Sequence, residues 1–202
     1  MAYSDFTFSK LSLNFGIKQD NSNLFENSKI KSLEPSPTLI DALSDISFIA
    51  LNSEKAKSEV LIYPIIRELM RRNRHISVFS GYAFNVKGQK GLTGAPDFLI
   101  SAKPRSVEPQ SPIFCLVETK NKSADEGYAQ CAAEMYAARL FNQQTNEPYE
   151  IIYGAVTNAY DWVFLKLEGD TVYIDTQRYY LNELPKLLGI LQFIVDQIKL
   201  VN

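Results

Sequence analysis

The chain has 202 residues, of which 46% are hydrophobic and 22% charged, so it can bury a sizeable core as one domain. Its formal net charge of −2 excludes a protein whose whole surface is basic. A single histidine and two cysteines, Cys115 and Cys131, exclude a structural zinc cluster, and the apolar neighbours of both cysteines favour buried thiols in a reducing compartment.

The sequence offers no targeting or membrane signal. The opening residues, MAYSDFTFSKL, lack the basic stretch and apolar block of a secretory signal. The apolar run LLGILQFIV near the C-terminus is about half of the roughly 20 residues that a membrane-spanning helix needs. We therefore expect a cytoplasmic protein that does not cross a membrane.

Residues 1–36 are weakly specified, because the polar run KQDNSNLFENSK and the segment SLEPSP indicate irregular structure. We expect them to form an arm on a single domain that spans residues 37–202. The arm has four apolar anchors: Phe6, Phe8, Leu11 and Phe15.

The domain begins with two predicted helices, because apolar residues recur at helical spacing over residues 37–46 and 54–73. Pro64 lies inside the second helix and cannot donate to the carbonyl of Val60. A kink is therefore expected one step after Glu59.

Strands dominate the rest of the chain, interrupted by one helix and followed by another. The predicted strands are 75–86, 97–102, 113–120, 151–157, 161–167 and 171–176; the helices are 126–142 and an apolar C-terminal segment with Pro185 near its start. This order predicts an α/β (α+β) fold with one mixed β-sheet flanked by helices on both faces.

The third predicted strand carries charged residues at its end. Glu118 and Lys120 follow a continuous apolar run, and strand alternation places them on one face about 7 Å apart. Glu118-Thr-Lys120 is the one place where lysine follows an acid two residues later, and Pro96-Asp97 is the one Pro-Asp pair. If the two strands are hairpin neighbours, Asp97 and Glu118 can hold a divalent cation such as Mg²⁺, with Lys120 beside it.

This arrangement resembles the motif of the PD-(D/E)xK nuclease superfamily over roughly residues 54–166. The resemblance implies a restriction-endonuclease-like fold and Mg²⁺- or Mn²⁺-dependent hydrolysis of phosphodiester bonds in nucleic acid, with DNA as the substrate. Glu59 matches a glutamate on the helix before the sheet, and Gln130 matches a glutamine on the helix after the lysine strand. The whole chain also resembles a group of cyanobacterial proteins with blocks such as SGYAFNV and VETKN, a likeness that implies no reaction.

The resemblance implies a role for each matched residue. The expected metal ligands are Asp97, Glu118, the carbonyl of Thr119 and Glu59. The expected catalytic group consists of Asp97, Glu118, Lys120, Glu59 and Gln130, in which Lys120 serves the attacking water.

Each of these residues has an alternative interpretation that involves no chemistry. Asp97 can be an ordinary turn residue, and Glu118 and Lys120 a surface ion pair. Glu59 can pair with Lys55 on an exposed helix. The polar stripe that contains Gln130 on helix 126–142 can be a solvated face.

Basic residues are concentrated between Arg67 and Lys90, a segment that contains six of them and a single acidic residue. We expect nucleic acid to contact Arg71, Arg72, Arg74, Lys87, Lys90 and Lys122. The alternative is that the arginines complement a helix C-terminus and the lysines solubilise a loop.

The sequence is also compatible with two other interpretations of the whole chain. The protein can be a non-catalytic nucleic-acid-binding or protein-interaction module that retains the nuclease fold. It can also be a homodimer, because the C-terminal helix is apolar around most of its circumference, although a core helix would have the same pattern.

Overall fold

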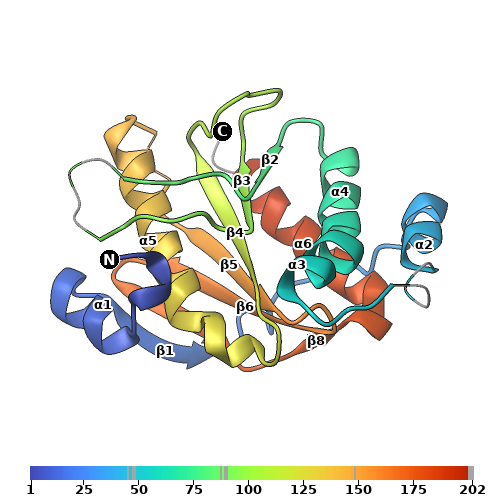
Figure 1. Ribbon diagram of the computed structural model, residues 1–202. Helices are drawn as coiled ribbons and strands as arrows, with labels where there is room; N and C mark the ends of the chain where they lie inside the picture. Colours follow the sequence, from blue (N-terminus) through green and yellow to red (C-terminus); the bar gives the residue numbers. More distant parts are fainter. Residues whose placement is uncertain (45, 47–48, 87, 89–90, 148, 200–202) are drawn as a thin grey trace.

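The computed structural model describes residues 1–44, 46, 49–86, 88, 91–147 and 149–199. It has a mixed α/β fold in which one eight-stranded sheet is packed against helices, as the element order predicts (Figure 1). The helices are α1 (Phe8–Phe15), α2 (Pro37–Ser44), α3 (Glu54–Lys57), α4 (Tyr63–Arg72), α5 (Tyr128–Gln144) and α6 (Leu184–Lys199). The strands are β1 (Lys18–Ser22), β2 (Ser77–Ser80), β3 (Phe98–Ser101), β4 (Ile113–Thr119), β5 (Ile152–Thr157), β6 (Asp161–Glu168), β7 (Thr171–Asp175) and β8 (Tyr179–Tyr180).

The strands follow the order β1-β7-β6-β5-β4-β3-β2, and β8 pairs with β6. Strands β2, β3 and β4 form an antiparallel meander, after which α5 connects β4 to the parallel strand β5. Parallel neighbours need such a crossover, and it brings the first turn of α5 to the ends of β4 and β5.

Helices cover both faces of the sheet, as predicted. Gly154 faces α5, since a Cβ atom there would lie 2.6 Å from the sulfur of Met135 and 2.7 Å from that of Cys131. Ala155 follows Gly154 in β5 and therefore points to the other face of the sheet. Phe164 of β6 pairs with Ala155 and lies on that same face. There its ring lies 5.7 Å from that of Phe25, which also contacts Phe193 of α6. The absent side chain at Gly154 lets α5 lie close to the sheet beside the middle of β4.

The N-terminal arm has more regular structure than its sequence predicts. It contains α1 and β1, and β1 pairs in parallel with β7 at one edge of the sheet. The predicted anchors do pack: Phe6 and Leu11 are buried, and Phe8 and Phe15 pack against the core.

The helix that contains Pro64 has the expected irregularity, in the form of a π-helical turn. This turn, η3, spans Ser58–Ile62 and joins α3 to α4. The N–H of Tyr63 donates to Ser58, one residue further back than in an α-helix. A wider turn accommodates Pro64, which has no backbone N–H to donate. The same turn changes which side chains of α3 face the sheet.

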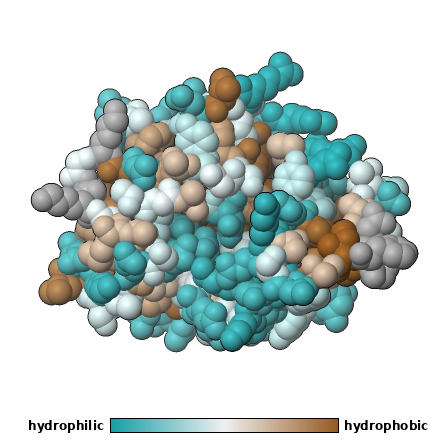
Figure 2. Space-filling model, in the orientation of Figure 1, coloured by the Kyte–Doolittle hydropathy of each residue, from teal (hydrophilic) through white to brown (hydrophobic). Residues whose placement is uncertain are grey.

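The apolar circumference of α6 is covered within one chain. Its buried residues are Leu187, Leu188, Ile190, Leu191, Ile194, Val195 and Ile198. This burial favours the core-helix interpretation, and a homodimer stays a prediction. None of the helices in the described ranges is both long and apolar enough to cross a membrane. On the face drawn in Figure 2, apolar residues form separate small patches on a mostly hydrophilic surface.

Candidate functional site

Strands β3 and β4 bring Asp97 and Glu118 together. Phe98 pairs with Val117, so the next residues along the two strands, Asp97 and Glu118, lie opposite each other. The backbone N–H of Thr119 donates to Oδ2 of Asp97 at 2.6 Å and fixes that carboxylate against the end of β4. The prediction that Asp97 faces Glu118 across adjacent strands is confirmed.

Lys120 connects β4 to α5. Its Nζ donates to Oε1 of Glu118 and to Oε1 of Gln130, each at 2.9 Å. Gln130 completes the cycle, because its Nε2 donates to Oε1 of Glu118 at 2.6 Å. The structure therefore brings the predicted Gln130 together with the strand residues, and we call Asp97, Glu118, Lys120 and Gln130 the strand-end cluster.

Lys120 remains charged in this position. Burial lowers the pKa of its ammonium, but the adjacent Glu118 carboxylate outweighs burial and leaves the pKa above its ordinary value. A lysine that holds its proton so firmly cannot act as a general base near neutral pH. It can donate hydrogen bonds and stabilise negative charge.

Glu118 carries an oxygen that none of the described residues satisfies. Its side chain is 6% exposed, and Oε2 has no hydrogen-bond partner in this part of the chain. Burial raises the pKa of Glu118 to about 7, the charge of Asp97 adds to that effect, and Lys120 opposes it. A buried carboxylate oxygen without a partner is costly, and a cation beside it would remove that cost.

Asp97 is the more accessible carboxylate of the pair. Burial raises its pKa, whereas the hydrogen bond from the backbone of Thr119 opposes the rise. The donor set of two hard carboxylate oxygens fits Mg²⁺ or Mn²⁺, which keep several waters and need one or two protein carboxylates. In the ranges that the structure describes, no three His, Cys, Asp or Glu side chains form a ready-made metal cage.

Glu134 belongs to the same network, and the sequence interpretation missed it. It is fully buried one turn after Gln130, whose Nε2 donates to its Oε1 at 3.1 Å. Burial, followed by the charge of Glu118, raises the pKa of Glu134 well above its ordinary value. Its spacing of four from Gln130 was a usable signal, but polar residues at that spacing also mark a solvated face.

The structure does not place Glu59 with the strand-end cluster. Its carboxylate is exposed and lies 3.9 Å from Nζ of Lys55, as the alternative interpretation predicts. Glu54, at the start of α3, accepts from the N–H of Asn121 at 3.0 Å, and its charge raises the pKa values of Asp97 and Glu118. The expectation for Glu59 is therefore corrected: of the two glutamates on the helix before the sheet, Glu54 is the one that interacts with the cluster.

Exchanging these two glutamates for glutamine should separate their effects. Glu54→Gln is expected to lower the pKa of Glu118, since it removes a negative charge that opposes ionisation. Glu59→Gln, the matched control, is expected to leave that pKa unchanged. Carboxyl ¹³C NMR titration measures both, and an equal response in the two variants would contradict the assignment.

Lys57 holds the loop that follows β4. It is 8% exposed, donates from Nζ to the carbonyl of Asn121, and lies 5.8 Å from the centre of the Tyr160 ring. The N–H of Lys120 also donates to the carbonyl of Thr157, at 2.8 Å. These contacts fix the backbone that directly follows Thr119, whose carbonyl stays a predicted ligand.

The four predicted basic residues that the structure describes divide into two groups. Arg72 forms a 2.7 Å ion pair with Glu68 and donates to the carbonyl of Glu34, so it serves the fold. Arg71, Arg74 and Lys122 are exposed. Lys87 and Lys90 lie outside the described residues.

No protein-family model matches the chain, and neither does any curated protein. Among solved structures, the chain is similar to one titled "cryoEM structure DrdV-DNA complex", with 12% sequence identity and a TM-score of 0.43. The match covers 78% of this chain and 13% of that one.

Proposed function

We propose that the protein is a Mg²⁺- or Mn²⁺-dependent phosphodiesterase of the PD-(D/E)xK superfamily that hydrolyses nucleic acid, with DNA as its substrate. The observation that carries this proposal is the strand-end cluster, in which Asp97, Glu118, Lys120 and Gln130 meet at the ends of β3 and β4. The unpartnered Oε2 of Glu118 is a further reason to expect a cation there.

Asp97 and Glu118 would hold the cation, together with the carbonyl of Thr119. A bound Mg²⁺ polarises a phosphoryl oxygen and lowers the pKa of a coordinated water. Glu54 adds negative charge to the same region, which raises the pKa values of both carboxylates.

Lys120 would orient the attacking water and stabilise the charge that develops on the phosphate. Its Nζ already donates hydrogen bonds to Glu118 and Gln130, which suits a donor role. Gln130 fixes the position of the lysine by accepting from Nζ while it donates to Glu118. We also place this activity in the cytoplasm, since the buried free thiols of Cys115 and Cys131 suit a reducing compartment.

Cleavage of DNA and RNA tests the proposal. The wild type is expected to cut DNA with Mg²⁺ or Mn²⁺ and to stop when the metal is chelated. Lys120→Ala and Asp97→Ala are each expected to lower the rate by about 10²-fold or more, the effect of removing one strong transition-state contact. Activity that survives both substitutions would refute the proposal.

A second candidate function is a non-catalytic module that binds nucleic acid or protein. The closed hydrogen bonds among Lys120, Glu118 and Gln130 favour it, because they hold the ammonium of the lysine in place without any ligand. Calorimetric titration with Mn²⁺ distinguishes the two functions. The nuclease should bind the metal and lose that binding in Glu118→Ala, whereas the module should show no response in either protein.

A further inference from the structure

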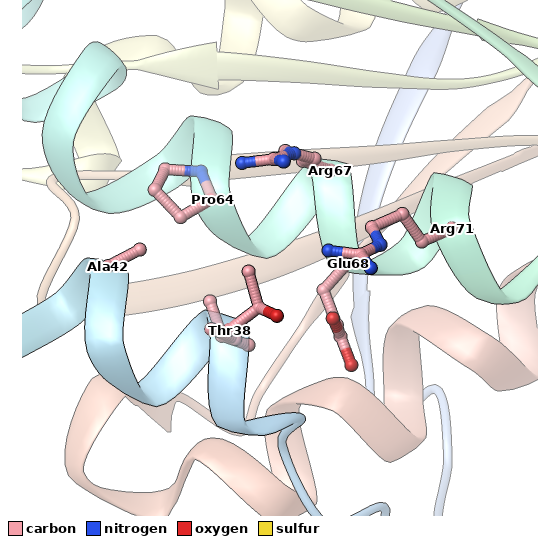
Figure 3. A pocket seen from close by; sticks show the side chains of 7 residues that line it. Thr38, Ala42, Pro64, Arg67, Glu68 and Arg71 are labelled. Carbon is pink, nitrogen blue, oxygen red and sulfur yellow. The ribbon is translucent and has the colours of Figure 1, made fainter.

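The exposed side of α4 carries a row of arginines that begins at a tyrosine. Tyr63, Arg67 and Arg71 are spaced by four residues, so they lie on one side of the helix about 6 Å apart along its axis. Arg74 lies two residues after the end of the helix. All four side chains are exposed, and Figure 3 shows Arg67 and Arg71 projecting from α4.

The charges of this row are not neutralised by the fold. Glu68 is the one acid in α4, and its carboxylate is taken by Arg72 at 2.7 Å and by the hydroxyl of Ser36. Over the described part of the chain, neither Arg67, Arg71 nor Arg74 forms an ion pair.

The helix dipole does not explain the row either. Its effect is confined to the last turn, whereas Arg67 lies five residues before the end of α4. The row therefore presents positive charge on a protein whose net charge is −2.

One end of the row packs against the start of β3. The ring of Tyr63 stacks on Phe98 at 6.5 Å with an interplanar angle of 18°, and Phe98 directly follows Asp97. Tyr63 nevertheless remains 45% exposed, so part of its ring is free to contact a ligand. From there α4 leads away from α3 toward β2 (Figure 1).

The other end opens into a larger hollow. Arg74 lines it together with Arg105, Ser106 and Met70, and its volume is about 480 Å³. Arg105 also forms no ion pair within the described ranges. By contrast, the pocket between α2 and α4 in Figure 3 holds about 10 Å³, room for a single water, so it is no small-molecule site.

We propose that a single strand of nucleic acid binds along α4, with its phosphates on Arg67, Arg71, Arg74 and Arg105 and a base stacked on Tyr63. Arginine suits phosphate because its guanidinium donates two parallel hydrogen bonds. An exposed aromatic ring beside a basic track binds unpaired bases, whereas the bases of a duplex are already stacked inside it. This inference rests on the proposed function, from which it takes nucleic acid as the ligand. It adds that the bound nucleic acid is single-stranded.

Fluorescence anisotropy with a labelled DNA oligonucleotide in EDTA tests the inference without cleavage. Arg67→Gln/Arg71→Gln should weaken binding at least tenfold and lower the salt slope of log K by about 1.4 for a single strand. The matched control Lys10→Gln/Lys18→Gln removes two exposed charges from α1 and from β1 at the opposite edge of the sheet, and it should bind as the wild type does. Equal binding by both double variants would overturn the inference.

Three further variants separate contact from folding. Arg67→Lys/Arg71→Lys keeps the charge and should recover most of the affinity, which a merely structural role would not predict. Tyr63→Leu keeps an apolar side chain on Phe98 but removes the ring, and it should weaken single-strand binding about 5- to 100-fold, while Tyr63→Phe should not. A duplex of the same sequence should bind more weakly, and a preference for the duplex would contradict the single-stranded form.

The outcome is independent of the reaction. Binding through Arg67 and Arg71 without cleavage in Mg²⁺ would leave this inference standing and remove the nuclease. If the wild type cleaves DNA but the arginine variant binds as tightly as the wild type, the nuclease proposal stands and this inference falls.

Discussion

Glu118→Gln is expected to abolish metal-dependent cleavage while leaving the protein at least as stable as the wild type. The substitution removes a charged oxygen from the cation site. The loss of rate should therefore exceed the roughly 10- to 100-fold that outer partners of a metal site contribute. The glutamine oxygen can still accept from Lys120 and Gln130, so the hydrogen bonds that position α5 persist.

The stability of the folded protein should not fall, because burial makes the charged form of Glu118 unfavourable in the wild type. Burial raises the pKa of Glu118 to about 7, which means that its charged form destabilises the folded state. Cleavage assays and thermal melting in EDTA provide the two readouts. Glu59→Gln, whose native carboxylate is exposed, is the control and should change neither. Full activity in Glu118→Gln, or a large loss of stability without loss of activity, would contradict the assignment.

The metal-free protein is expected to lose stability as the pH rises from about 4.5 to about 7. A carboxyl whose pKa is higher in the folded state binds its proton more tightly there. Its contribution is therefore complete below pH 4.5 and is lost as the pH passes the folded value of about 7. Glu134 and Asp97, whose pKa values are also raised by burial, act in the same direction.

Denaturant unfolding in EDTA between pH 4.5 and pH 8 measures this trend. The difference in unfolding free energy between the wild type and Glu118→Gln isolates the contribution of Glu118, and it should change steadily across the window. Added Mg²⁺ should restore wild-type stability at pH 8 but not at pH 4.5, where a proton occupies Glu118. A difference that is constant with pH would show that Glu118 titrates normally.

The strand-end cluster could be predicted because it follows from local rules. Alternation along β4 places Glu118 and Lys120 on one face, and hairpin pairing places Asp97 opposite Glu118. Gln130 followed from the resemblance to a known motif rather than from the pattern of its own helix.

The helix glutamate could not be predicted in the same way. The side of the helix that faces β4 depends on the π-helical turn at Ser58–Ile62, which shifts the helical phase between α3 and α4. Pro64 predicts an irregularity in the helix, but the sequence does not predict that it is a π-helical turn. Glu54 therefore replaces Glu59 beside the cluster.

Strand β1 and the burial of Glu134 were missed for opposite reasons. The sequence of β1, KQDNS, is polar throughout because it forms an exposed sheet edge, so it has no alternation to detect. Glu134 is a charged residue type that becomes fully buried, which only the close packing of α5 against Gly154 and its neighbours reveals.

The most direct test of the central claim is the initial rate of DNA cleavage by the wild type and by Lys120→Ala, each measured with Mg²⁺ and with EDTA. The proposed chemistry predicts cleavage by the wild type with Mg²⁺ alone, and at least about a 10²-fold lower rate for the variant. Cleavage that persists in EDTA, or equal rates for the two proteins, would contradict a metal-dependent site built on Asp97, Glu118 and Lys120.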